Sequence, residues 1–69
     1  MKEIRDCKGR LACKGDAATG LIESMYRGQK TQTILAVGAY LIIERDGVVT
    51  VITRISLTAF KVESHAGAA

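Results

Sequence analysis

The sequence predicts a small all-β domain, an antiparallel meander or open barrel of five to six short strands. Six of the seven glycines recur between residues 9 and 47 at intervals of five to ten residues, and β-branched residues are frequent in those intervals. Proline, which interior strand positions exclude, is absent, so glycine supplies the turns. Parallel strands need crossovers of a dozen or more residues, and connections this short therefore predict antiparallel neighbours.

The first fifteen residues contain a short internal repeat, Cys7-Lys8-Gly9 followed by Cys13-Lys14-Gly15. A glycine closes each six-residue unit, which suits two short strands and two tight turns.

Residues 16–27 are open to two interpretations. Their apolar residues recur at helical spacing and Gly28 could end a short helix, although Gly20 in its interior costs about 1 kcal/mol. In the alternative, Gly20 is a turn and residues 21–27 form a strand that pairs with residues 31–37 across Gly28. We favour the strand and leave the helix open.

The clearest element is a hairpin of residues 39–45 and 48–55 that turns at Asp46-Gly47. Asp-Gly between two β-rich runs is typical of a two-residue type I′ turn, because both positions need positive φ. This turn predicts the pairs Tyr40–Thr53, Ile42–Val51 and Glu44–Val49 on one face, and Leu41–Ile52 and Ile43–Thr50 on the other. Both faces carry apolar pairs, so either the hairpin lies centrally in a curled sheet or one of its faces meets a partner.

The last predicted strand lies near the C-terminus, where Thr58, Phe60 and Val62 alternate with Lys61 and Glu63. We expect a single domain over residues 1–63, and a flexible tail of small and polar residues over 64–69.

The composition favours a soluble cytoplasmic protein. The longest apolar run, residues 34–43, is about half the length of a membrane span. The N-terminus carries charges where a signal peptide would be apolar. Two cysteines are fewer than a small secreted domain usually carries. We therefore expect a cytoplasmic location and no membrane partner.

No residue pattern indicates catalysis, a metal or a cofactor. Zinc sites commonly place two to four residues between paired cysteines, whereas five separate Cys7 from Cys13. His65 is the single histidine and lies in the predicted tail, and the carboxylates form no signature pair. We expect a non-enzymatic protein without metal or cofactor.

The preferred functional hypothesis is a protein-interaction module, with a homodimer as one form of it. The apolar face of the hairpin supplies the predicted interface, formed by Tyr40, Ile42, Val49 and Val51.

The alternative hypothesis is a small basic β-barrel that binds nucleic acid. The net charge of +3 comes from the first fifteen residues, and cationic grooves with aromatic platforms bind single strands. The candidate contacts are Lys8, Arg10, Lys14, Tyr26, Arg27 and Lys30. The plain alternative is that these cations keep the domain soluble and protect strand edges.

The N-terminal run from Lys2 to Cys13 resembles the opening of small uncharacterised proteins from mobile elements of gut Firmicutes. Those chains continue with a strand, a short Lys-Gly-type turn and another strand, similar to Tyr26-Arg-Gly-Gln-Lys-Thr31 here. The resemblance implies an accessory protein of a phage or conjugative element, and it implies no activity and no site residues.

Overall fold

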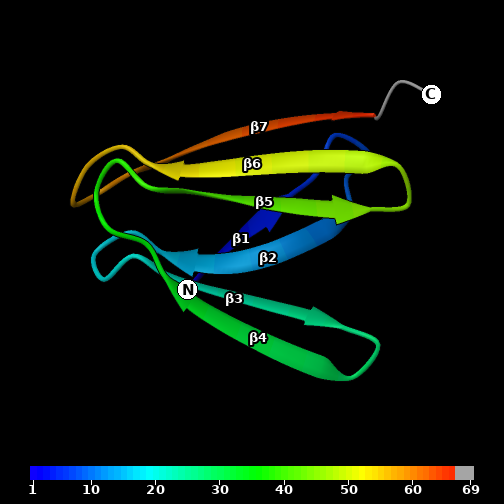
Figure 1. The fold of residues 1–69 in the computed structure, drawn as a ribbon, viewed down its shortest axis with the longest axis horizontal. Helices are drawn as coiled ribbons and strands as arrows, with labels where there is room; N and C mark the ends of the chain where they lie inside the picture. The colour runs from blue at the N-terminus through cyan, green and yellow to red at the C-terminus, as the bar shows by residue number, and fades with distance from the viewer. Residues whose placement is uncertain (67–69) are drawn as a thin grey trace.

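The computed structural model describes residues 1–66, which form seven strands and no helix. The strands are β1 (Lys2–Arg5), β2 (Leu11–Asp16), β3 (Leu21–Tyr26), β4 (Gln29–Ile34), β5 (Tyr40–Arg45), β6 (Val48–Arg54) and β7 (Phe60–Ala66). They make two antiparallel meanders, a four-stranded sheet ordered β1-β2-β3-β4 and a three-stranded sheet ordered β5-β6-β7 (Figure 1). The all-β prediction is confirmed. The strand number exceeds the predicted five to six, because even the four-residue β1 pairs along its length.

Residues 21–26 form strand β3, as favoured, and the alternative helix over residues 16–27 does not form. The Gly20 N–H donates to the Asp16 carbonyl (2.8 Å), which turns the chain before β3. β3 then pairs residue by residue with β4 across the Arg27-Gly28 turn. This pairing buries Ile22 while Met25 stays exposed. Residues three positions apart lie on opposite faces of a strand but on the same face of a helix, so this burial pattern is that of a strand.

The hairpin formed by β5 and β6 has the predicted turn and the predicted register. Asp46 and Gly47 adopt φ values of 51° and 76°, as a type I′ turn requires. The pairs run from Arg45–Val48 beside the turn to Tyr40–Thr53 at the far end. Along β6, buried and half-buried residues alternate strictly, so one face of the hairpin is the core face.

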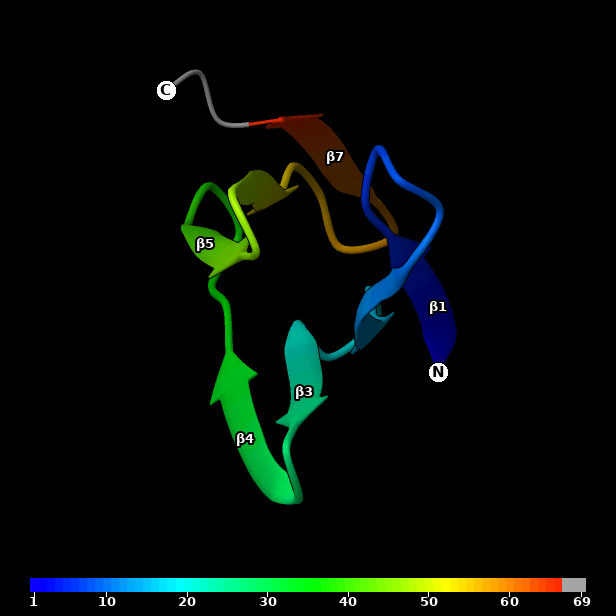
Figure 2. The same ribbon diagram turned by 90° about the vertical axis from the view of Figure 1, so that its right-hand side faces the viewer.

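The core lies between the two sheets, which face each other as an open sandwich (Figure 2). Its buried apolar residues are Ile4, Cys13, Ile22, Leu35 and Ile52, with Ala39, Leu41, Ile43 and Phe60 packed against them. Gly15 lies under the Phe60 ring, which would stand 2.8 Å from a Cβ at that position. Among the described strands none bridges the two sheets, so the barrel considered from the sequence does not close.

Strand β7 continues three residues beyond the predicted domain end at residue 63. Ser64 pairs with Thr50 on β6, and their hydroxyl oxygens lie 3.0 Å apart. The Ser64 hydroxyl also accepts a hydrogen bond from the Cys7 N–H (2.9 Å). These bonds make residues 64–66 part of the sheet rather than part of a tail. The rest of the predicted tail, 67–69, lies outside the described residues.

Arg54, at the end of β6, is a buried charge with 6% of its surface exposed. Its guanidinium donates to three backbone carbonyls, those of Leu35 (2.9 Å), Ala17 (3.2 Å) and Ala18 (3.2 Å). One side chain therefore joins the β2–β3 turn, the β4–β5 link and β6. The backbone of Arg54 also bonds to Gly38 and Ala39, so this cluster sets where β5 begins.

Candidate functional site

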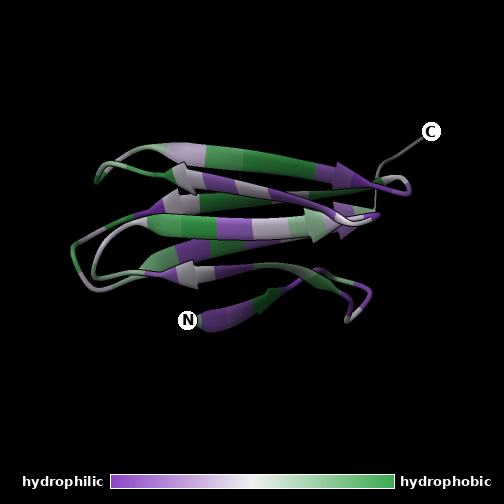
Figure 3. Cartoon of the chain, turned by 90° about the horizontal axis from the view of Figure 1, so that it is seen from below, coloured by the Kyte–Doolittle hydropathy of each residue, from purple (hydrophilic) through white to green (hydrophobic). Residues whose placement is uncertain are grey.

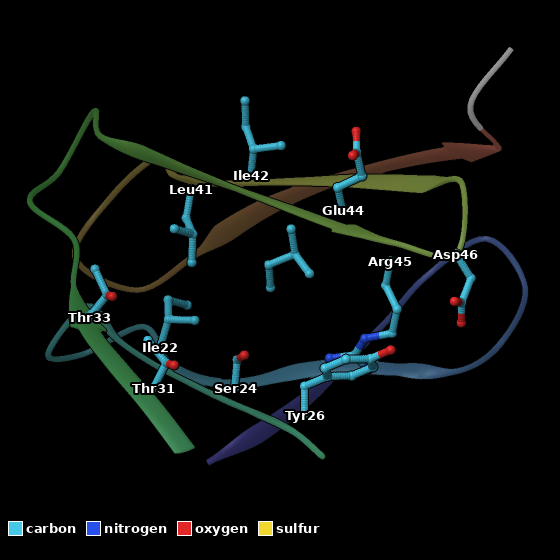
Figure 4. Close-up of a pocket in the computed structure, with 11 residues that line it drawn as sticks. Ile22, Ser24, Tyr26, Thr31, Thr33, Leu41, Ile42, Glu44, Arg45 and Asp46 are labelled. Atoms are coloured by element: carbon cyan, nitrogen blue, oxygen red, sulfur yellow. The ribbon is translucent and has the colours of Figure 1, made fainter. Parts of the chain in front are cut away.

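The main cleft of the protein lies between the β3–β4 hairpin and β5, and has a volume of about 430 Å³ (Figure 4). Its two sides come from different sheets, because β3 and β4 belong to the four-stranded sheet and β5 belongs to the three-stranded one. The residues that line it are Ile22, Ser24, Tyr26, Thr31, Thr33, Leu41, Ile42, Ile43, Glu44, Arg45 and Asp46.

The floor of the cleft, formed by β3 and β4, carries hydroxyl groups, and its roof, formed by β5, is apolar at first and charged towards the turn. Ser24 and Thr31 are paired across β3 and β4, and Thr33 is paired with Ile22, so three hydroxyl groups share the inner face of the hairpin. Within residues 1–66 these three hydroxyl groups make no hydrogen bond. In the roof, Leu41 packs against the core. The sequence does not predict this cleft. Each strand that lines it can be predicted from neighbouring residues, but the way in which strands of the two sheets come to face each other cannot.

One end of the cleft is closed by an arginine stacked on an aromatic ring. The Arg45 guanidinium carbon lies 4.6 Å from the centroid of the Tyr26 ring, within the range of a cation–π contact. Arg45 also donates to the Leu11 carbonyl (3.1 Å). These two contacts of Arg45 join β5 to both β2 and β3, and fix the position of this edge of the three-stranded sheet.

The free edge of β5 is a second candidate site. The two sheets have four edge strands, β1, β4, β5 and β7. Natural edges are blunted by charges or bulges. β1 carries Lys2, Glu3 and Arg5 and a register shift. β4 carries Lys30 among polar residues, and β7 carries Lys61, Glu63 and His65.

β5 has no such protection over its first four residues, Tyr40 to Ile43, and it pairs with β6 without a bulge. Tyr40 is 63% exposed and Ile42 is 54% exposed. Figure 2 shows β5 at the margin of its sheet, with β6 on one side and no strand on the other. An apolar, unbulged and open edge of this kind is a template on which another strand can pair.

The four predicted interface residues share the outer face of the three-stranded sheet. Tyr40 and Ile42 are exposed there, while Val49 and Val51 are half-buried by their neighbours. No other described segment lies over this face. Ile42 thus belongs both to the predicted apolar face and to the open edge.

The predicted nucleic-acid contacts are divided between two places. The loop that holds Lys8 and Arg10 and the turn that holds Tyr26 and Arg27 lie at one end of the sandwich, whereas Lys14 and Lys30 lie on the outer face of the four-stranded sheet. Figure 3 shows the same polarity, with hydrophilic turns at one end and apolar connections at the other.

Acidic neighbours engage several of these cations. Arg10 contacts Asp6 and Asp46, each at 3.2 Å, and Lys30 lies 3.6 Å from Glu23. A hydrogen bond from the Gln32 amide, aided by the charges of the nearby lysines, lowers the pKa of Glu23. This part of the surface therefore offers phosphate less free positive charge than the residue count suggests.

The two cysteines differ in exposure, which predicts a difference in reactivity. Cys7 is exposed, whereas Cys13 is buried, and burial raises its pKa to about 11. Because the thiolate is the reactive form, we expect one thiol to react with Ellman's reagent at pH 8 in the native protein. The second should react only after unfolding in urea. The Cys7→Ser variant should show no fast thiol, and a fast reaction there would contradict the burial of Cys13.

Burial of Cys13 also implies a pH dependence of stability. The pKa of Cys13 is raised on folding, so the folded state disfavours the thiolate. The buried neutral thiol contributes its full stability below pH 9.0, the ordinary pKa of a cysteine, and this contribution is lost as the pH rises towards 11.

The described residues show neither a metal centre nor a membrane-spanning helix. Among the described residues, no three histidine, cysteine, aspartate or glutamate side chains gather as a metal site would require. In the same part of the chain, no helix has the length and apolar character that crossing a membrane requires. The chain matches no protein-family model, no curated protein and no solved structure. The resemblance to mobile-element proteins and the cytoplasmic location stay predictions.

Proposed function

We propose that the protein is a non-catalytic interaction module that recruits an extended strand to the free edge of β5. The observation that carries the proposal is the contrast between the four edges. Strands β1, β4 and β7 carry charged or polar residues along their length, whereas β5 alone among the described edges begins with four consecutive apolar residues, 40–43, and has no bulge. Strand addition uses backbone hydrogen bonds for affinity and alternate side chains for specificity.

The size of the apolar face favours edge pairing over face-to-face packing. Three strands of about seven residues, spaced about 4.8 Å apart with a rise of about 3.3 Å, cover a projected area of only about 300 Å². A stable interface usually takes about 800 Å² from each partner. The face alone is therefore small, and the backbone groups of β5 supply the missing interactions.

The geometry of the hairpin indicates which backbone groups are free. The Ala39 carbonyl accepts a hydrogen bond from the Arg54 N–H (3.0 Å), so residues 39, 41, 43 and 45 direct their groups towards β6. In an antiparallel ladder, successive residues direct their backbone groups to opposite sides of the strand. The N–H and C=O groups of Tyr40, Ile42 and Glu44 consequently point to the open edge.

A synthetic strand tests this proposal. A peptide with the sequence of residues 40–45 between solubilising lysines is titrated into ¹⁵N-labelled protein. We expect saturable amide shifts centred on Tyr40, Ile42 and Glu44, since these amides gain a partner. The same peptide methylated on alternate backbone nitrogens is the control, and should give no shifts. Shifts that centre on β4 or β7, or none at β5, would contradict strand recruitment.

Nucleic-acid binding draws less support, because acidic side chains accompany Arg10 and Lys30. A salt-sensitive oligonucleotide complex whose shifts map to Lys8, Arg10 and Arg27 would favour that function instead.

A further inference from the structure

We propose that the strand recruited by β5 is β5 of a second copy, paired antiparallel about a two-fold axis at Ile42. This inference rests on the proposed function and adds the identity of the partner and the register. The resulting dimer has a continuous six-stranded sheet, ordered β7-β6-β5-β5-β6-β7.

The side-chain order of β5 selects this register. Residues that face each other across an antiparallel pair point to the same side of the sheet. Two-fold pairing of β5 with itself therefore has its centre on a single residue, which is Leu41, Ile42 or Ile43. These three possibilities differ in what they place opposite the apolar and charged residues.

The register centred on Ile42 is self-complementary on both faces. On the outer face Ile42 meets Ile42 of the second copy, and Tyr40 meets Glu44, so the phenol can donate a hydrogen bond to the carboxylate. On the inner face Leu41 meets Ile43. Arg45 meets Ala39, which keeps like charges apart.

The two other registers are less favourable. A centre on Ile43 places the carboxylate of Glu44 opposite the apolar Ile42. With a centre on Leu41, Glu44 and Arg45 lie beyond the end of β5 of the second copy, opposite its link of residues 35–39. The ladder between the two strands is then shorter. A charged residue opposite an apolar one forfeits the stabilisation that a matched cross-strand pair contributes.

The backbone agrees with this choice. Ile42 directs its N–H and C=O to the open edge, so two Ile42 residues on a two-fold axis can exchange both hydrogen bonds. The pairing is isologous, because the same edge serves both copies, and it therefore stops at a dimer rather than continuing as a filament. It also removes the unprotected edge, while the remaining outer edges, both β7, carry Lys61, Glu63 and His65.

The apolar face becomes continuous across the seam. Ile42 is paired with Val51 of β6 in each copy, so a row of four aliphatic side chains crosses the six-stranded sheet. On the inner face, Leu41 and Ile43 of the second copy extend the apolar part of the roof of the cleft.

Cysteine cross-linking tests the register. In a Cys7→Ser background, Ile42→Cys places two thiols on the two-fold axis at a Cα separation of about 5.5 Å, within disulfide range. We expect mild oxidation to cross-link this variant at least tenfold faster than the matched Ile34→Cys control. Ile34 is aliphatic and 73% exposed, but lies on β4. Ile43→Cys, which would lie on the axis of the alternative register, should cross-link no faster than the control.

Light scattering on the unmodified chain supplies the second readout. We expect a mass that rises to that of a dimer with concentration. Ile42→Lys should weaken dimerisation by at least tenfold, since two ammonium groups then face each other, whereas Ile34→Lys should leave it unchanged.

The outcomes separate this inference from the proposed function. If the β5 peptide binds but the chain remains monomeric at high micromolar concentration, the partner is a different strand and the inference is wrong. If a dimer forms but Ile43→Cys cross-links faster than Ile42→Cys, the register is wrong. If neither the peptide binds nor a dimer forms, the proposed function itself fails.

Discussion

Replacing Gly20 with alanine is expected to unfold most of the protein at room temperature, whereas the same change at Gly28 should leave it folded. Both glycines adopt a φ of +81°, so alanine meets the same backbone strain of about 1–2 kcal/mol at either position. The surroundings differ. A Cβ at Gly20 would collide with the Leu35 carbonyl oxygen and lie 2.7 Å from a guanidinium nitrogen of Arg54, whereas nothing lies within 4 Å of one at Gly28.

The collision at Gly20 cannot be relieved by a flexible side-chain end, because the nearest atom belongs to the backbone. Relief would require the turn to move away from Leu35, which breaks the Leu35 N–H to Gly20 carbonyl bond of 2.8 Å. A domain of this size has a stability of about 3–10 kcal/mol, and we expect Gly20→Ala to remove at least about 4 kcal/mol.

Urea denaturation followed by circular dichroism measures the difference between the two variants. Gly28→Ala should lower the free energy of unfolding by about 1–2 kcal/mol. Equal losses at both positions would mean that the close approach around Gly20 is absent in solution.

Replacing Arg54 with methionine is expected to destabilise the fold by about 3 kcal/mol, a large part of its total stability. Methionine retains most of the buried aliphatic chain but removes the three donors that bond to Leu35, Ala17 and Ala18. Hydrogen bonds to a charged donor contribute about 1.5–3 kcal/mol each, and their sum is reduced by the cost of burying the guanidinium.

Lys61→Met is the matched control, since it removes a cation from the same sheet. The Lys61 side chain is 61% exposed and lies 3.7 Å from Glu63, and exposed pairs of this kind contribute little. We expect its unfolding free energy to change by less than about 0.5 kcal/mol. Arg54→Lys should recover part of the loss, because one ammonium group cannot reach three carbonyls in different directions. A loss at Arg54→Met no greater than at Lys61→Met would show that the cluster is not a stabilising centre.

The Arg54 cluster bears on function because it determines where β5 begins. The backbone of Arg54 bonds to Gly38 and Ala39, and its side chain bonds to Leu35 in the same link. The start of β5, and with it the free edge, is therefore held by the hydrogen bonds of Arg54 to three residues of the preceding link. A weakened cluster should reduce the affinity of β5 for a partner strand even though Arg54 does not touch that edge.

Elements that depend on neighbouring residues can be predicted from the sequence. Asp46-Gly47 selects a two-residue turn with positive φ, and a two-residue turn leaves one register for the strands on either side. The whole pairing from Arg45–Val48 to Tyr40–Thr53 could thus be predicted. The turn at Gly20 also favours the strand at 21–26, but the apolar residues at helical spacing permit a helix as well, and it is the pairing with β4 that excludes the helix.

Which surfaces face each other depends on the packing of the two sheets and cannot be predicted from neighbouring residues. Both faces of the β5–β6 hairpin carry apolar pairs, so no local pattern distinguishes the core face from the face that holds Tyr40 and Ile42. The cleft lies between strands of two separate sheets. The carbonyls that accept hydrogen bonds from the buried Arg54 lie 19 to 37 positions away in the chain. Turn chemistry acts over two or three residues and can be read along the chain. The packing of one sheet on another depends on all of their side chains together, and it was this packing that left the β5 edge free.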